Sequence, residues 1–202
     1  MLRYVALGDS YTIGTSVNEP ERWPNQLVGV LAGDPVRLDL VANPAVNGFT
    51  SADVIAVELP RLAAQKPDFA TLLIGVNDVV QGVPEASYRA RFGEILATLR
   101  GLLPASRIVV VTTPDYTVTP AGADYGDPAT MRAGIQRVNA IATEEARRLG
   151  IAVVDIFEIS AGAAADPGLV ARDGLHPSGR QYGLWVERIA PVVRSLIGQP
   201  AP

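Results

Sequence analysis

Residues 1–8 read MLRYVALG, a short apolar run that ends at a glycine and is followed by Asp9 and Ser10. Within it we expect a strand over residues 3–7, and four similar runs recur at residues 36–41, 69–74, 107–112 and 151–155. Each run is rich in β-branched residues or leucine, is bounded by Gly, Pro, Asp or Asn, and lacks an alternating polar face. This pattern predicts five strands that are buried on both faces of a sheet.

Helical periodicity fills the intervals between these strands. Over residues 88–103, 135–149 and 182–196 apolar side chains recur on one face of a 3.6-residue period. Shorter helices are expected near Trp23 and from Ser51, whose hydroxyl is expected to cap a segment that runs to Leu59 before Pro60 interrupts it.

Alternation of strands and helices predicts an α/β protein, a three-layer α/β/α sandwich around a five-stranded parallel sheet. No linker, composition shift or internal repeat divides the chain, so we expect one domain over residues 1–202.

Composition excludes several classes of chemistry. The 202 residues are 48% apolar and 19% charged, carry a formal net charge of −4 and include no cysteine, which excludes disulfides, thiolate metal sites and cysteine nucleophiles. A single histidine, His176, excludes metal centres built from several imidazoles, and we expect no metal or cofactor. Without a cluster of basic residues, nucleic acid is not an expected partner.

No run approaches the roughly 20 apolar residues that a membrane span needs, and residues 1–8 are too short for a signal peptide. We therefore expect a cytoplasmic protein, or a secreted one if a signal peptide preceded the chain and was removed. The sequence does not indicate the oligomeric state.

Polar residues follow the predicted strands at the points where the strands end. The first strand leads into Gly-Asp-Ser at residues 8–10, the second is followed by Asn-Gly-Phe-Thr at 47–50, and the third by Gly-Val-Asn-Asp at 75–78. Asp-Gly-Leu-His-Pro at 173–177 precedes the last helix. In an open parallel sheet ligands bind beyond the carboxyl ends of the strands, so these side chains are expected at one edge.

These residue types match the requirements of serine hydrolysis. That reaction needs a hydroxyl nucleophile, an imidazole base, a carboxylate that orients the imidazole, and donors for the oxyanion. Asp173 lies three residues before His176, close enough to reach the ring nitrogen Nδ1, and Ser10 supplies a hydroxyl at the end of the first strand. The natural oxyanion donors are the backbone N–H groups of Ser10 and Gly48 and the side-chain amide of Asn77.

Each of these elements alone also fits a structural turn, since Gly, Asp and Asn are ordinary turn formers and a loop histidine needs no function. Their conjunction in this order at strand ends favours a catalytic site.

The four blocks resemble those of the SGNH (GDSL-type) hydrolase family of esterases and lipases, and the match runs from residue 8 to residue 176. The resemblance implies a flavodoxin-like sheet, with Ser10 as nucleophile, His176 as base and Asp173 as its orienting acid. It also implies an oxyanion hole formed by Ser10, Gly48 and Asn77. Two departures concern the substrate: Tyr11 replaces the leucine of the GDSL motif, and Phe49 follows Gly48 where small residues are common.

We therefore expect a serine esterase that hydrolyses short- to medium-chain acyl esters through an acyl-serine. The residues expected to contact substrate are Asp9, Tyr11, Phe49, Val79 and Tyr116, although Val79 and its neighbours fit a core at a helix entry equally well. The alternative enzyme on the same site is a deacetylase of carbohydrates or other small molecules.

Two readings lie outside this class. A phospho-acceptor receiver domain with Asp9 as acceptor would need a lysine after a late strand, but the only lysine, Lys66, precedes the third. An inactive binding module on the same scaffold is the other reading, and the intact Ser10, Asp173 and His176 speak against it.

Overall fold

A five-stranded parallel sheet in the order β2-β1-β3-β4-β5 organises the computed structural model, which describes residues 1–198. The last four residues of the expected domain, 199–202, lie outside the described residues. The strands are β1 (Leu2–Gly8), β2 (Leu38–Ala42), β3 (Phe69–Leu73), β4 (Ile108–Val111) and β5 (Ala152–Val154). The five predicted strands are confirmed, each with its ends displaced by at most two residues.

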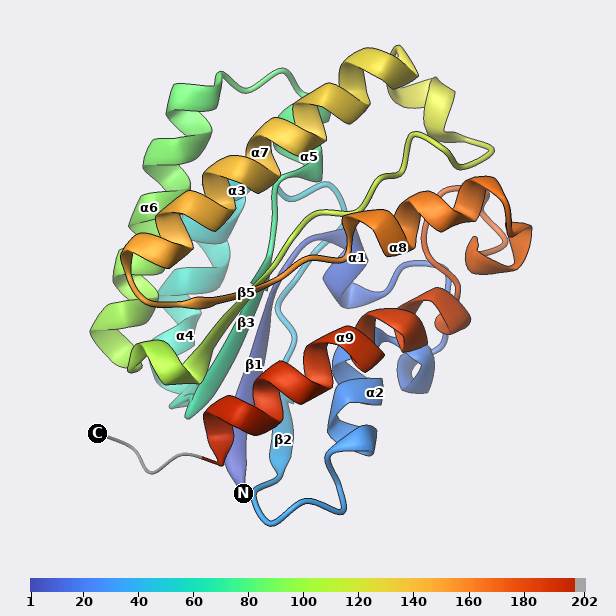
Figure 1. Cartoon of the computed structure of the whole chain (residues 1–202). Helices are drawn as coiled ribbons and strands as arrows, with labels where there is room; N and C mark the ends of the chain where they lie inside the picture. The colour runs from blue at the N-terminus through green and yellow to red at the C-terminus, as the bar shows by residue number, and fades with distance from the viewer. Residues whose placement is uncertain (199–202) are drawn as a thin grey trace.

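Helices cover both faces of this sheet, which confirms the expected α/β/α layers (Figure 1). On one face lie α2 (Trp23–Val30), α8 (Phe157–Ala161) and α9 (Gly179–Ile197), and on the other α4 (Leu59–Gln65), α6 (Glu85–Leu102) and most of α7 (Pro128–Arg148). Successive residues of β1 enter opposite cores: Tyr4 and Ala6 pack in the first, Val5 and Leu7 in the second. Because both faces are buried, the strands read as continuous apolar runs.

Three short helices begin at the carboxyl edge of the sheet. They are α1 (Ser10–Ile13), α3 (Ser51–Asp53) and α5 (Val76–Val80). Five 3-10 turns also occur among the described residues: Glu19–Glu21, Ala105–Arg107, Gly122–Tyr125, Gly162–Ala164 and Pro167–Leu169.

The helix around Pro60 departs from the prediction in two ways. Its first turn begins at Thr50, whose N–H and hydroxyl donate to Asp53 Oδ2 at 2.8 and 2.7 Å, whereas the Ser51 hydroxyl, expected to cap it, donates to Asp78 at 2.5 Å. The helix also continues through Pro60, because a π-helical segment, Val54–Glu58, precedes it and the N–H of Leu59 bonds to the carbonyl of Val54. The wider turn accommodates the proline ring and its missing N–H, so the expected interruption is wrong.

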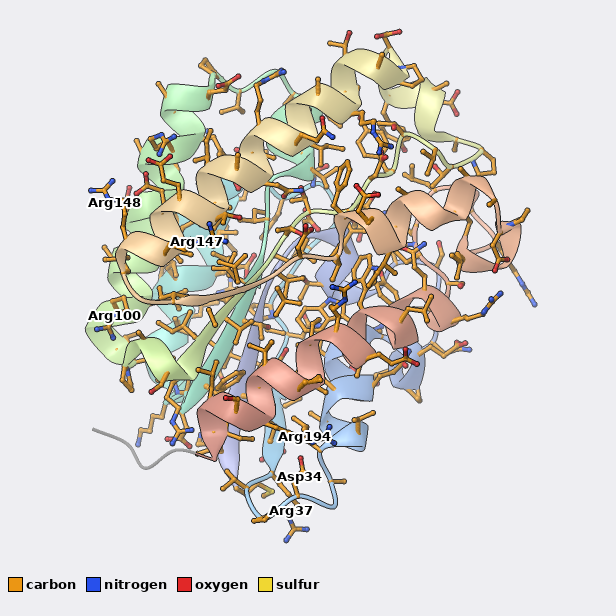
Figure 2. The ribbon with its side chains drawn as sticks, viewed as in Figure 1. Asp34, Arg37, Arg100, Arg147, Arg148 and Arg194 are labelled. Carbon is orange, nitrogen blue, oxygen red and sulfur yellow. The ribbon has the colours of Figure 1, made fainter. Side chains whose placement is uncertain are left out.

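Arginines close the long helices at the edge of the sheet away from Ser10. The last turns of α6, α7 and α9 contain Arg100, Arg147, Arg148 and Arg194 (Figure 2). The negative end of the helix dipole stabilises a positive charge at these positions. Arg194 also points toward Asp34, with Nε 2.7 Å from Oδ2, and so ties α9 to the loop after α2.

Among residues 1–198 no helix has both the length and the apolar character that crossing a bilayer requires.

Candidate active site

Ser10 stands in a tight turn between β1 and α1. Gly8 adopts φ +153°, and a Cβ there would collide with the carbonyl oxygen of Leu73 and the hydroxyl of Thr12, so only glycine fits. Asp9 caps the short helix, since its Oδ1 accepts the N–H of Tyr11 at 3.0 Å. The turn thus leaves Ser10 as the first residue of α1, with 6% of its surface exposed.

Asp173 and His176 form a compact hydrogen-bonded loop. Oδ1 of Asp173 accepts the backbone N–H groups of Leu175 and His176 at 2.9 and 3.0 Å, and Oδ2 lies 2.6 Å from Nδ1 of His176. Partial burial raises the pKa of Asp173, but hydrogen bonds from Ser16, Leu175 and His176 outweigh it and lower the pKa to about 2. The carboxylate is therefore ionised over the working range of an imidazole base, and its bond to Nδ1 leaves Nε2 as the ring nitrogen able to take a proton.

Gly48 and Asn77 come together from two different strand ends. Gly48 adopts φ +81° in the loop after β2, a backbone conformation that favours glycine. Asn77 lies in the first turn of α5, and its Nδ2 donates to the carbonyl of Phe49 at 2.8 Å. Asp78 accepts the N–H of Ser51 at 2.9 Å, which ties α5 to the start of α3. The Asn77 amide is thus held against the loop that carries Gly48.

One cavity of about 250 Å³ joins these elements. It is lined by the predicted nucleophile, base and oxyanion donors together with aromatic and aliphatic side chains: Ser10, Tyr11, Asn47, Gly48, Val76, Asn77, Val80, Tyr116, Tyr125, Leu175 and His176. The ring centroids of Tyr11 and His176 lie 5.3 Å apart, and those of Tyr116 and Tyr125 lie 6.0 Å apart in an edge-to-face pair. The cavity therefore combines a hydroxyl, an imidazole and amide donors with an aromatic wall.

The structure brings Ser10, Gly48, Asn77 and His176 to this cavity, with Asp173 behind the ring of His176. Of the residues expected to contact substrate, Tyr11 and Tyr116 line the wall. The other three, Asp9, Phe49 and Val79, are not part of this lining.

Asp9 is fully buried and points into the turn, while Phe49 contributes its carbonyl to Asn77 and stays outside the lining. Val79 packs against Gly134 of α7, whereas Val76 and Val80, four residues apart on one face of α5, reach the cavity in its place.

A set of buried carboxyl groups lies beneath the serine turn. Glu58, fully buried, accepts the N–H of Gly8 at 3.1 Å through Oε2. Burial raises the pKa of Glu58 to about 8, with a further contribution from the neighbouring Asp9 and Asp53, and burial raises the pKa of Asp9 to about 7. Sequence patterns did not reveal Glu58, because nothing local to it marks a side chain that reaches Gly8 at the end of β1.

Sequence reasoning also missed Thr15 and Ser16, which follow α1. Their hydroxyls bond to Asn47 Oδ1 and Asp173 Oδ2. The only local feature that marks them is the succession of two hydroxyl residues after Gly14, and this feature does not predict which residues they contact. Within residues 1–198 no three His, Asp or Glu side chains are grouped as a metal site would require.

Comparison with known proteins identifies the family of the chain and structures that share its fold. The sequence model of the GDSL-like lipase/acylhydrolase family matches residues 6–184. No curated protein matches the chain.

Several solved structures share the fold. A lipase/acylhydrolase from Enterococcus faecalis is 19% identical with a TM-score of 0.75, and the match covers 100% of both chains. The psychrotrophic esterase EstA from Pseudoalteromonas sp. is 15% identical with a TM-score of 0.73, over 98% of this chain and 99% of that chain. A catalytic mutant of Axe2, an acetylxylan esterase from Geobacillus stearothermophilus, is 20% identical with a TM-score of 0.71, over 98% and 95%.

Proposed function

Because the chain belongs to the GDSL-like lipase/acylhydrolase family, we propose that it is a serine esterase that hydrolyses short- to medium-chain acyl esters. The observation that carries this proposal is the placement of the only histidine. Its Nδ1 lies 2.6 Å from a carboxylate, and its ring shares one cavity with the hydroxyl-bearing Ser10. A base oriented in this way can accept a proton through Nε2.

The reaction proceeds in two acyl-transfer steps. Ser10 Oγ attacks the ester carbonyl while His176 takes the hydroxyl proton, and the resulting oxyanion is stabilised by the backbone N–H groups of Ser10 and Gly48 and the amide of Asn77. The intermediate collapses to an acyl-serine as His176 gives that proton to the leaving alcohol. Water, deprotonated by His176, then attacks the acyl carbonyl, and the proton returns to Ser10 Oγ as the acid leaves.

Cavity size supports small substrates. A volume of about 250 Å³ lies below the ~300 to 1,000 Å³ typical of sites for drug-sized ligands. The aliphatic side chains of Val76, Val80 and Leu175 suit an acyl group of limited length.

The second candidate is a deacetylase of carbohydrates or other small molecules. One observation favours it: Tyr125 lines the cavity beside Tyr116 with 44% of its surface exposed. An exposed aromatic ring combines an apolar face with a polar hydroxyl and suits stacking on the alcohol part of an ester, such as a sugar ring.

Covalent labelling tests the proposal. A fluorophosphonate probe should modify Ser10, located by mass spectrometry of the digested protein, and Ser10→Ala should abolish both the label and the hydrolysis of p-nitrophenyl butyrate. Comparison of acetate, butyrate and octanoate esters with acetylated xylo-oligosaccharides then separates the esterase from the deacetylase. A folded wild-type protein that neither reacts with the probe nor hydrolyses any of these esters would instead be an inactive binding module.

A further inference from the structure

Two consecutive hydroxyl side chains, Thr15 and Ser16, connect the serine turn to both other parts of the candidate site. Their segment is anchored to Ser10 itself, since the carbonyl of Ser10 accepts the N–H groups of Gly14 at 3.0 Å and Thr15 at 3.1 Å. The position of this segment is therefore fixed relative to the predicted nucleophile.

Thr15 makes the connection to the oxyanion side. Its Oγ1 donates to Oδ1 of Asn47 at 2.5 Å, and Asn47 directly precedes Gly48. Both Asn47 and Gly48 line the cavity. The bond joins the segment that follows α1 to the loop after β2.

Ser16 makes the connection to the acid–base side. Its Oγ donates to Oδ2 of Asp173 at 2.6 Å, the same oxygen that lies 2.6 Å from Nδ1 of His176. Oδ2 of Asp173 therefore bonds both to the ring of His176 and to the hydroxyl of Ser16, which follows the turn of Ser10.

The backbone of Ser16 is unusual. Among the described residues only Ser16, at φ +66°, and Lys66, at φ +46°, combine a side chain with a left-handed backbone. For a residue other than glycine that conformation costs on the order of 1 kcal/mol. Ser16 is also exposed, so water would satisfy its hydroxyl if Asp173 did not. A strained backbone that aims an exposed hydroxyl at Asp173 indicates a requirement for that contact.

We propose that Thr15 and Ser16 are positioning residues. They hold the loop that carries Gly48 and the Asp173–His176 loop at fixed distances from Ser10. This inference rests on the esterase proposed above. A hydrogen bond at an exposed site contributes only about 0.5 to 1.5 kcal/mol to the free energy of unfolding. By contrast, a displacement of about 1 Å between reacting groups can lower the reaction rate about 100-fold. The effect of losing these hydroxyls therefore falls on kcat more than on folding.

Paired substitutions at Ser16 separate the hydroxyl from the backbone. Ser16→Ala removes the hydroxyl and keeps the left-handed strain, while Ser16→Gly removes both and stabilises the turn. We expect both to lower kcat by about tenfold with KM changed less than about twofold, although their melting temperatures differ. A merely structural turn predicts full kcat in Ser16→Gly, and that result would overturn the proposal.

Lys66 offers the matched control for backbone strain. It ends α4 at the opposite edge of the sheet and has the same kind of left-handed backbone. Lys66→Ala and Lys66→Gly should differ in stability as the Ser16 pair does, but both should keep wild-type kcat.

Thr15→Val tests the other connection with a side chain of the same shape. We expect kcat to fall about three- to tenfold, while Thr143→Val on α7, outside the cavity, leaves it unchanged. Wild-type kcat in Thr15→Val would exclude Thr15 from the proposal.

A spectroscopic measurement makes the test independent of activity. Because His176 is the only histidine, its Nδ1 proton gives a single low-field imidazole resonance. Ser16→Ala should shift that resonance, since Oδ2 loses its second donor, and Lys66→Ala should not. An unshifted resonance would overturn the role of Ser16 even if the protein hydrolyses no ester. If the wild-type protein is not labelled by the probe but the resonance shifts in Ser16→Ala, the proposed esterase activity is rejected and the contact between Ser16 and Asp173 is supported.

Discussion

The side-chain amide of Asn77 donates to the backbone carbonyl of Phe49 at 2.8 Å, so an α5 side chain holds the loop that carries Gly48. Asn77→Ala removes both the proposed oxyanion donor and this loop contact. We expect kcat for p-nitrophenyl butyrate to fall about 100- to 1000-fold. Asn139→Ala is the matched control, because Asn139 Nδ2 likewise donates to a backbone carbonyl, that of Thr113 at 2.9 Å, outside the cavity. Equal losses of kcat in the two variants would remove Asn77 from the oxyanion hole.

Asp173→Asn tests the carboxylate while keeping the loop. The amide oxygen can still accept the N–H groups of Leu175 and His176, but an NH₂ group replaces Oδ2 beside Nδ1 and favours the wrong tautomer of the ring. We expect kcat to fall on the order of 1,000- to 10,000-fold with a melting temperature close to wild type. Asp166→Asn is the control, since Asp166 accepts the N–H of Gly168 at 3.0 Å and pairs with Arg180 in a nearby loop. A retained rate in Asp173→Asn would contradict the assigned role.

Glu58→Gln should change how stability depends on pH. Because the pKa of Glu58 is raised from 4.5 to about 8, its contribution to folding is fully present below the unfolded pKa and is lost as pH rises toward 8. Glutamine keeps an acceptor for the N–H of Gly8 and does not titrate.

Urea unfolding at pH 5 and pH 8 checks this expectation. The loss of unfolding free energy between the two pH values should shrink in Glu58→Gln by about 1 to 3 kcal/mol. The residual slope includes contributions from Asp9, whose pKa burial raises to about 7, and from Asp78, whose pKa burial also raises. Glu94→Gln, at an exposed position of α6, should leave the wild-type slope unchanged, and the same slope in Glu58→Gln would show that Glu58 does not titrate in this range.

Tyr11→Leu should alter the choice of acyl group. Tyr11 is 3% exposed, lines the cavity and lies beside the His176 ring, so a smaller side chain enlarges the cavity and costs about 1 to 3 kcal/mol of stability. We expect the ratio of kcat/KM for octanoate over butyrate esters to rise by about tenfold. A ratio equal to that of wild type would place the acyl group elsewhere.

Local signals in the sequence were sufficient to predict the sheet and the gathering of the candidate site residues at one of its edges. The strands are continuous apolar runs because both faces are covered, and parallel strands bring Ser10, Asn77 and the loop of Gly48 to one edge. The long helices follow from their 3.6-residue periodicity. Asp173 and His176 are three residues apart, so their contact needs no long-range information.

What the sequence did not reveal depends on contacts between distant segments. Ser51 fails as a cap because its hydroxyl bonds to Asp78 on another helix, and Pro60 is tolerated because a π-helical segment precedes it. Val79 and Val80 are neighbours of one residue type, and only the packing of α5 against Gly134 decides which of them faces the cavity. The bond from Ser16 to Asp173 joins two loops whose closure no local pattern encodes.

The order of these groups along the chain has a consequence for biosynthesis. Ser10 is synthesised before the carboxylate and the imidazole, which follow all five strands, and α9, which packs against α2, follows them. A truncated or nascent polypeptide therefore carries the hydroxyl without the groups that would activate it. Under the proposed mechanism, hydrolytic competence therefore arises only after the segments from β1 to the loop of His176 have been synthesised and have folded together.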